Sequence, residues 1–389
     1  MSTLEWLPAV LEKKFGVKPT IDKSGPIEEA SFGYMSQIRR VRLTWPEGHG
    51  KQDLPESVVV KAPVEGTAGA AWDAATGEKE ADADDAELAA AIGNLKKVQE
   101  SCHETESQIY GIFVDDDYQA PLPMPKTYAS FPIDSPHPAI VMEDIRGATT
   151  DDVVEGFTEK QIYAIVDGLV NLHVMCYSTE KWKKFNVNLD PSVPLGFIAM
   201  TKKMVGELAK AYPLEVLAKV RDYIATQDWF TGYLAKYATP ELIGRAVLVH
   251  GDMWAPQFLW RGDELAAIVD WQIAHYGSPT EDMLRLLVLG VRSDLRQQWT
   301  PAILQYYYKE LTSRLQAKAG KRPPFTFEQL QEEYRNTLPY TVGMSVFAFA
   351  MWSNSPVLKR GGPEDGDRVE EVFGRVLSLL HEFEAAYGL

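Results

Sequence analysis

The chain has 389 residues, 45% of them hydrophobic and 24% charged, which is ordinary for a globular protein with two or three lobes or domains. Its formal net charge of −16 disfavours nucleic acid and anionic membranes as general partners. The N-terminus has no signal-peptide pattern and no apolar run reaches the roughly 20 residues of a membrane span. Cys102 and Cys176 follow no disulfide or metal spacing, so we expect reduced thiols in a cytoplasmic protein.

The first part of the chain predicts one helix followed by strands. Apolar residues recur at helical spacing up to Phe15, and Gly16 ends that segment. A strand–turn–strand region follows, with Phe32 and Gly33 at its turn. The turn has only one glycine, which is weak for a phosphate loop, but its backbone N–H groups are candidates for cradling a phosphate.

The next strand and helix supply a candidate ion pair. Residues 58–63 read as a buried strand with Lys61 near its end, and residues 94–113 read as a helix with Glu106 on its apolar face. A carboxylate on that face should have a cationic partner, because an unpaired buried charge costs several kcal/mol. Lys61 paired with Glu106 would aim its ammonium at phosphates; the alternative is a purely structural salt bridge.

Between these two elements, residues 64–91 are rich in alanine and acidic residues. This bias is typical of a solvated loop or a weak surface helix, so we interpret the segment as an insertion without a function of its own. Residues 139–144 form a further predicted strand that runs into a polar linker. We therefore predict an N-terminal lobe over residues 1–145, including the insertion, and a helical C-terminal lobe over residues 146–389.

The second lobe shows helical periodicity and two N-terminal capping patterns. T-x-x-Q at Thr158 and S-x-x-E at Ser278 are typical capping boxes. His173 lies on the apolar face of the first of these helices and is interpreted as a core residue. Further helices are expected over residues 197–211, 214–225, 228–237, 282–291, 301–318, 327–353 and 367–386.

Two short apolar runs interrupt the helices, and each ends in a polar cluster with an aspartate. The first is Val247–Gln257, with the sequence VLVHGDMWAPQ, and the second is Ala267–Gln272, AIVDWQ. A turn at residues 261–264 predicts that the two runs fold back as a hairpin and bring Asp252 and Asp270 together.

Two carboxylates beside an amide side chain suit magnesium-assisted phosphoryl transfer. Asp252 would orient or deprotonate a substrate hydroxyl, while Asp270 and the amide oxygen of Gln257 would bind magnesium. The structural alternative is a polar turn that caps a helix, beside an exposed aspartate at a strand end. His250 is expected to hold the loop by hydrogen bonds. Asp282 is expected either to stabilise its own helix N-terminus or to brace the catalytic loop.

With Lys61, Glu106, the segment Val141–Asp144, H-G-D-x-W at 250–254 and V-D-W-Q at 269–272, the chain resembles the protein-kinase-like superfamily. It is most similar to the CHK kinase-like group, which includes ecdysteroid kinases, in the aminoglycoside phosphotransferase and choline kinase branch. The resemblance implies an α+β fold with a small β-rich lobe and a larger helical lobe, and ATP between them. It also implies that Lys61 contacts the phosphates, that the backbone of Met142, Glu143 and Asp144 binds adenine, and that Asp252 is the catalytic base.

We therefore expect an ATP- and Mg²⁺-dependent kinase that phosphorylates a hydroxyl of a small molecule. The family pattern has asparagine where this chain has Gln257, and the longer side chain favours a second hypothesis, a pseudokinase that binds nucleotide or ligand without transfer. A protein kinase is disfavoured because residues 271–278 are too short for an activation segment.

Overall fold

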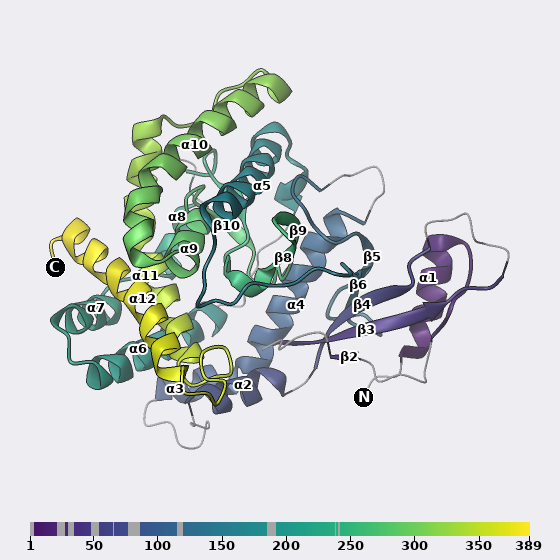
Figure 1. Ribbon diagram of the computed structural model, residues 1–389, viewed down its shortest axis with the longest axis horizontal. Coiled ribbons are helices and arrows are strands. Elements are labelled where there is room, and N and C mark those ends of the chain that lie inside the picture. The colour runs from purple at the N-terminus through teal and green to yellow at the C-terminus, as the bar shows by residue number, and fades with distance from the viewer. Residues whose placement is uncertain are drawn as a thin grey trace.

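The structure is a computed structural model that describes residues 4–21, 28–29, 35–47, 54–64, 66–76, 86–114, 120–184, 192–237, 239 and 242–389. It has the two-lobed α+β fold that the sequence predicts (Figure 1). The smaller lobe holds an antiparallel sheet with the order β1-β3-β4-β6-β5, and β2 also pairs with β3. Its strands are β1 (Thr20–Ile21), β2 (Glu28–Glu29), β3 (Ser36–Thr44), β4 (Ser57–Pro63), β5 (Thr127–Phe131) and β6 (Ala139–Glu143).

The N-terminal helix α1 (Leu7–Phe15) covers one face of this sheet, at the right of Figure 1. Leu7 and Leu11 of α1 pack against strand valines such as Val58 and Val141, and all four side chains are buried. Apolar residues at i and i+4 of a helix fall on one face, so the helix can bury this stripe against the alternating face of the strands. Helix α4 (Leu95–Ile112) contacts β4, β5 and β6.

The larger lobe is mainly helical and contains the main hydrophobic core. Its helices are α5 (Glu159–Ser178), α6 (Ser192–Ala211), α7 (Glu215–Thr226), α8 (Thr231–Lys236), α9 (Glu281–Gly290), α10 (Ser293–Ala319), α11 (Phe327–Trp352) and α12 (Asp365–Tyr387). The capping box predicted at Thr158 is confirmed, because its hydroxyl accepts from the backbone N–H of Gln161 and the Gln161 side chain accepts from the Thr158 N–H. None of the helices in the described ranges is both long enough and apolar enough to cross a membrane.

Two short β-units carry the polar clusters. β7 (Val247–Val249) pairs with β10 (His275–Gly277), whereas β8 (Phe258–Arg261) and β9 (Glu264–Ile268) form the hairpin. The prediction that the turn at 261–264 folds the 247–249 run onto the 267–269 run is therefore wrong in its pairing. The turn is local and joins the strands on either side of it, while β7 finds its partner further along the chain.

The prediction for the alanine-rich segment, residues 64–91, is also corrected. The segment forms α2 (Thr67–Thr76) and α3 (Ala86–Gly93), and α3 packs on α6 while α2 contacts α11. These contacts bury a hydrophobic cluster made of Ala68, Trp72, Leu88, Ala91, Leu95, Ala199, Met200 and Met204. Rather than a solvated loop or a weak surface helix, the described parts of this segment, α2 and α3, make an apolar contact with the helical lobe.

Candidate active site

Lys61 lies in the middle of the sheet, where β4 places it opposite Ile38 of β3 and Ile140 of β6. Its ammonium forms an ion pair with Glu106 of α4, with Nζ 2.7 Å from Oε2, and a second ion pair with Asp270. The pairing of Lys61 with Glu106 is the one that the strand and helix patterns predict. The second partner, Asp270, belongs to the larger lobe. The Lys61 ammonium therefore links the two lobes.

Both side chains of the Lys61–Glu106 pair are buried, so the charges of this site depend on one another. Burial disfavours the ammonium, but Asp270 and Glu106 more than offset it and raise the pKa of Lys61 above its usual value. Burial likewise opposes ionisation of Asp270, yet Lys61 beside it holds the pKa of that carboxyl below its usual value. The site therefore keeps a cation and a carboxylate in direct contact.

Asp270 has an unusual backbone conformation. With φ of 70°, it is the single non-glycine residue with positive φ in the described part of the chain. Such a conformation costs of order 1 kcal/mol and persists where the surroundings hold it, commonly at functional sites. Here the Gln257 Nε2 donates to Asp270 Oδ2 at 3.0 Å, and the Gln257 carbonyl accepts from Val269 N–H at 2.9 Å. Asp270 still has 24% of its side chain exposed.

His250 joins the two aspartate loops, as expected of a residue that holds the loop. Asp252 N–H donates to His250 Nδ1 at 3.2 Å, so the proton of the neutral ring must be on Nε2. That nitrogen lies 2.9 Å from the carbonyl oxygen of Val269, the residue before Asp270. One imidazole thus fixes the backbones of Asp252 and Asp270 relative to each other.

Asp282 braces the same loop from α9. Its carboxylate accepts from the N–H groups of His250 at 2.8 Å and Gly251 at 2.9 Å. Of the two roles expected for Asp282, the structure shows this brace. Gly251 has φ of 84°, and a Cβ there would lie 2.9 Å from the Ile273 carbonyl oxygen, so only glycine fits the turn.

The capping box predicted at Ser278 is wrong. The N-cap of α9 is Thr280, with a helical backbone and no side-chain cap. Ser278 Oγ instead accepts from the Thr280 N–H at 3.2 Å, which makes a local turn. Glu281 turns inward, accepts from the Tyr233 hydroxyl at 2.7 Å and lies 3.1 Å from His275 Nε2.

Sequence reasoning missed Arg285. Its Nη2 lies 2.9 Å from Asp252 Oδ1, and its Nη1 donates to the Met344 carbonyl at 3.0 Å. A signal was present in the sequence, because Arg285 is a lone cation in the otherwise apolar run 283–289. A buried guanidinium in such a run requires an acidic partner, and Asp252 is that partner here.

The predicted adenine segment lies at the end of β6. Met142 is buried, and the Glu143 N–H donates to the Lys126 carbonyl at 2.8 Å. The Asp144 Oδ2 accepts from Ser57 Oγ at 2.6 Å and Arg40 Nε at 2.9 Å, and the Asp144 carbonyl accepts from the Arg146 N–H at 2.7 Å. The predicted phosphate turn, Phe32 and Gly33, lies outside the described residues.

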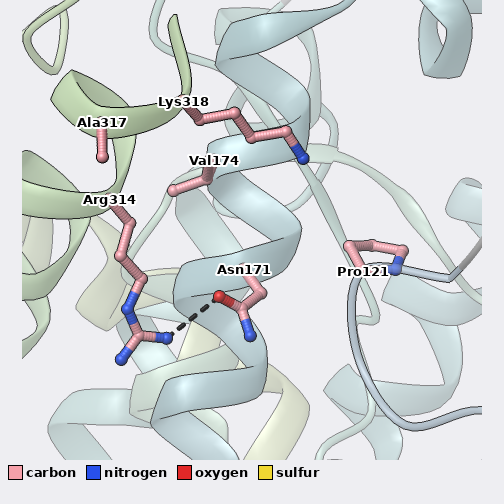
Figure 2. A pocket seen from close by; sticks show the side chains of 6 residues that line it. All are labelled: Pro121, Asn171, Val174, Arg314, Ala317 and Lys318. Atoms are coloured by element: carbon pink, nitrogen blue, oxygen red, sulfur yellow. Dashed lines mark hydrogen bonds between the residues drawn. The ribbon is translucent and has the colours of Figure 1, made fainter.

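A separate cavity of about 450 Å³ lies between α5 and α10 (Figure 2). Arg314 Nη1 donates to Asn171 Oδ1 there at 3.0 Å, and none of the candidate site residues lines it. The cavity therefore adds nothing to the geometry around Asp252 and Asp270.

The chain is similar to two proteins of Caenorhabditis elegans. It is 24% identical to the uncharacterized kinase-like protein D1044.1, over 67% of this chain and 70% of that protein. It is 26% identical to the uncharacterized oxidoreductase dhs-27, over 78% of this chain but only 36% of that protein. The chain thus spans about a third of dhs-27, and the oxidoreductase in that name refers to the longer protein.

Among solved structures, the choline kinase from Cryptosporidium parvum Iowa II shares the fold, with a TM-score of 0.50 and 10% identity over 98% of this chain and 96% of that one. The model of the DUF1679 family, described as "Uncharacterized oxidoreductase dhs-27", matches residues 10–364. The chain therefore belongs to the DUF1679 family, and it shares the fold of a choline kinase.

Proposed function

We propose that this protein is an ATP- and magnesium-dependent phosphotransferase that phosphorylates a hydroxyl group of a small molecule. The observation that carries the proposal is the pairing of one ammonium, Lys61, with carboxylates from both lobes, Glu106 and Asp270. Phosphoryl transfer needs a cation and a metal-binding carboxylate on the same phosphates, and this arrangement brings such a pair together.

The small lobe would hold the nucleotide. Glu106 fixes Lys61, so the ammonium is oriented before a phosphate replaces Asp270 as its partner. The backbone at Met142–Asp144 would bind adenine, and the turn at Phe32 and Gly33 would cover the phosphates. These positions are proposed from the family resemblance and from the place of β4 and β6 side by side in the sheet.

Asp270 and Gln257 would hold the magnesium ion. A carboxylate and an amide are oxygen donors that magnesium accepts, and the two side chains are already in contact at 3.0 Å. In the described ranges no group of three or more His, Cys, Asp or Glu side chains is placed to bind a metal. This suits magnesium in a nucleotide site, where phosphates and waters complete the shell. The ion would supply charge neutralisation to the phosphates.

Asp252 would orient the acceptor hydroxyl and take its proton. His250 and Asp282 hold the loop by its backbone, so the carboxylate is presented from a rigid turn. Catalysis in this arrangement is mainly positioning and charge neutralisation, which matches the small number of side chains involved.

The test replaces Asp252 with alanine. We expect phosphoryl transfer to fall by at least ~10³-fold while ATP binding stays close to wild type. Transfer is followed with labelled ATP and a metabolite extract, comparing the products of the two proteins, and ATP binding is followed by calorimetry. Asp263→Ala, in the exposed turn between β8 and β9, is the matched control and should keep wild-type transfer. Undiminished transfer by Asp252→Ala would contradict the proposal.

One observation favours a second candidate, a pseudokinase that binds nucleotide without transfer. Gln257 presents its amide nitrogen, rather than its oxygen, to Asp270 in the structure. An amide N–H group donates and cannot bind a cation, so metal binding would require the Gln257 amide to turn over. A pseudokinase predicts ATP binding with no ADP release in any acceptor mixture. Because this candidate attributes the defect to Gln257, it predicts that Gln257→Asn, which restores the family residue, strengthens the magnesium dependence of binding, and no improvement in Gln257→Asn would weaken it.

A further inference from the structure

Arg285 is a buried cation on α9, and no sequence motif assigns it a role in the site. All ten residues of α9 are buried, and Arg285 has only 6% of its side chain exposed. Burying a guanidinium costs several kcal/mol unless its donors are engaged. The contact that engages its charge is the one to Asp252 Oδ1, at 2.9 Å.

The guanidinium is itself fixed. Nη1 donates to the Met344 carbonyl of α11 at 3.0 Å, so Arg285 is anchored to a second helix before it reaches Asp252. The planar fork of arginine holds two acceptors at a set angle, which a lysine ammonium does not. The loop backbone is held separately by Asp282 and His250. The side chain of Asp252 is therefore oriented by Arg285 and its backbone by other residues.

This division leaves one carboxylate oxygen of Asp252 for a ligand. Oδ1 is occupied by Arg285, while no described residue donates a hydrogen bond to Oδ2. The Asp252 side chain is 18% exposed, three times the exposed fraction of Arg285. A carboxylate with one oxygen engaged by the protein and the other open to solvent is suited to receive a hydroxyl in one orientation.

We propose that Arg285 is a positioning residue for phosphoryl transfer: it holds the Asp252 carboxylate in the rotamer that points Oδ2 at the acceptor hydroxyl. The inference rests on the proposed function of Asp252 as the group that receives that hydroxyl. Arg285 touches neither nucleotide nor acceptor in this account and acts only through Asp252. Its removal should therefore affect the rate of transfer and not the binding of ATP.

The first experiment measures ADP release from MgATP by the full chain, with water as the acceptor. Arg285→Met should lower kcat by on the order of 10²-fold, with KM for ATP within about twofold of wild type, because positioning is lost and nucleotide contacts are kept. Arg285→Lys should recover part of this loss, since a lysine keeps the charge but not the fork. In an Asp252→Asn background, Arg285→Met should cause no further loss, because the residue it orients is already impaired.

The matched control is Arg296→Met. Arg296 is also a buried arginine, but it pairs with Glu382 and Ser378 between α10 and α12, away from Asp252. The Arg296→Met variant should be less stable than wild type and should keep the wild-type kcat. Three results would overturn the proposal: an equal loss of kcat in Arg296→Met, a rise in KM in place of a fall in kcat, or the same loss for Arg285→Met with and without Asp252.

The second experiment needs no turnover and separates this inference from the proposed function. Thermal unfolding of wild type, Arg285→Met, Asp252→Asn and the double variant forms a cycle. A double variant that loses less Tm than the sum of the single losses demonstrates the coupling, and strictly additive losses overturn the inference. If the coupling is present but wild type transfers no phosphoryl group to any acceptor in a metabolite extract, the phosphotransferase is rejected and the pair is a structural clamp. If transfer occurs but the losses are additive, the positioning role alone is overturned.

Discussion

Lys61 of the small lobe and Asp270 of the large lobe are in direct contact, and both belong to the proposed nucleotide site. The contact occupies the same carboxylate that we propose for the metal. Glu106, by contrast, binds Lys61 from the small lobe alone, at 2.7 Å. Binding of MgATP would then replace the Lys61–Asp270 contact with contacts to phosphate and metal, while Lys61–Glu106 stays in place.

This relationship predicts how nucleotide stabilises the protein. ATP with magnesium at 100 times its Kd should stabilise wild type by about 2.7 kcal/mol. In Asp270→Asn the magnesium-dependent part of this gain should disappear, because a neutral amide binds magnesium poorly, while ATP alone stabilises both proteins equally. Thermal shift with ATP, with and without magnesium, measures both parts. Asp263→Asn, in the exposed turn of the β8–β9 hairpin, should behave like wild type. A full magnesium response in Asp270→Asn would remove Asp270 from the metal site.

The ion pair at the centre of this site could be predicted because its signals are local. Lys61 follows a run of valines that only a buried strand explains, and Glu106 lies on a helical face with apolar residues at i+3 and i+4. The partner of β7 could not be predicted in the same way. Hairpin turns are encoded by adjacent residues, whereas the β7–β10 pairing joins segments separated by the whole β8–β9 hairpin.

The packing of α2 and α3 on the helical lobe could not be predicted from the sequence, for a different reason. The composition of residues 64–91 is dominated by alanine and acidic residues, while the contacts depend on a few large side chains such as Trp72 and Leu88. Their partners on α6 lie more than a hundred residues further along the chain, and no local pattern identifies such a partner. Arg285 shows the opposite case: its lone charge in an apolar run indicated a buried acid without indicating which one.

The contact between α2 and the helical lobe predicts a large effect of Trp72. Trp72 is 2% exposed within the cluster that joins α2, α3 and α6. Trp72→Ala should lower the free energy of unfolding by about 3–5 kcal/mol, the cost of a large buried cavity. Leu195→Ala is the control, since Leu195 of α6 is 62% exposed, and it should change stability by no more than about 0.5 kcal/mol. Urea denaturation measures both, and equal effects would mean that this segment does not dock in solution.

His173 predicts a specific loss of stability in acid. It is fully buried, its Nδ1 lies 2.7 Å from the Tyr307 hydroxyl, and burial lowers its pKa to about 3. Because the unfolded value is about 6.5, the unfolded chain binds the proton first, and stability falls as the pH drops below 6.5. Between pH 6.5 and 5, His173 alone should lower the free energy of unfolding by about 2 kcal/mol.

His173→Gln should remove that part of the pH dependence, whatever its effect on stability at pH 7. Urea denaturation of both proteins at pH 7, 6 and 5 gives the two slopes. His381→Gln, at an exposed position of α12, should keep the wild-type slope. If His173→Gln loses stability as steeply as wild type over this range, other groups account for the acid sensitivity.

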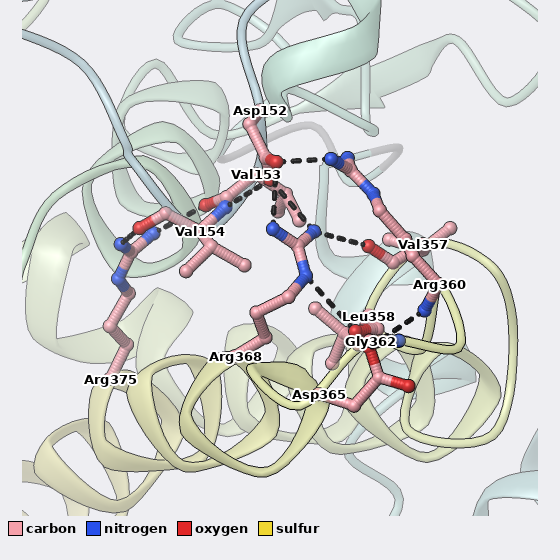
Figure 3. Close-up of polar contacts among 10 residues, drawn as sticks. All are labelled: Asp152, Val153, Val154, Val357, Leu358, Arg360, Gly362, Asp365, Arg368 and Arg375. Atoms are coloured by element: carbon pink, nitrogen blue, oxygen red, sulfur yellow. Dashed lines mark hydrogen bonds and ion pairs between the residues drawn. The ribbon is translucent and has the colours of Figure 1, made fainter.

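The strongest stability prediction concerns Arg375, which joins α12 to the linker before α5 (Figure 3) and also contacts α9. Its side chain is fully buried, and it donates to the carbonyls of Val153 at 2.8 Å and Leu289 at 2.7 Å, and also to that of Val154. Arg375→Met would leave these acceptors buried without donors. At about 1–3 kcal/mol for each of the three unsatisfied groups, the free energy of unfolding should fall by about 3–9 kcal/mol.

Arg360 provides the comparison, because it belongs to the same network but is 54% exposed. Its guanidinium lies 2.8 Å from Asp152, which Arg368 also binds from the buried side. An exposed ion pair contributes about 0–1 kcal/mol, so Arg360→Met should unfold at nearly the wild-type urea midpoint. Comparable midpoints for Arg360→Met and Arg375→Met would show that the carbonyl contacts of Arg375 are satisfied by water once the guanidinium is gone. A large difference, with unchanged m-values, would place the stability of this junction in those three carbonyl bonds.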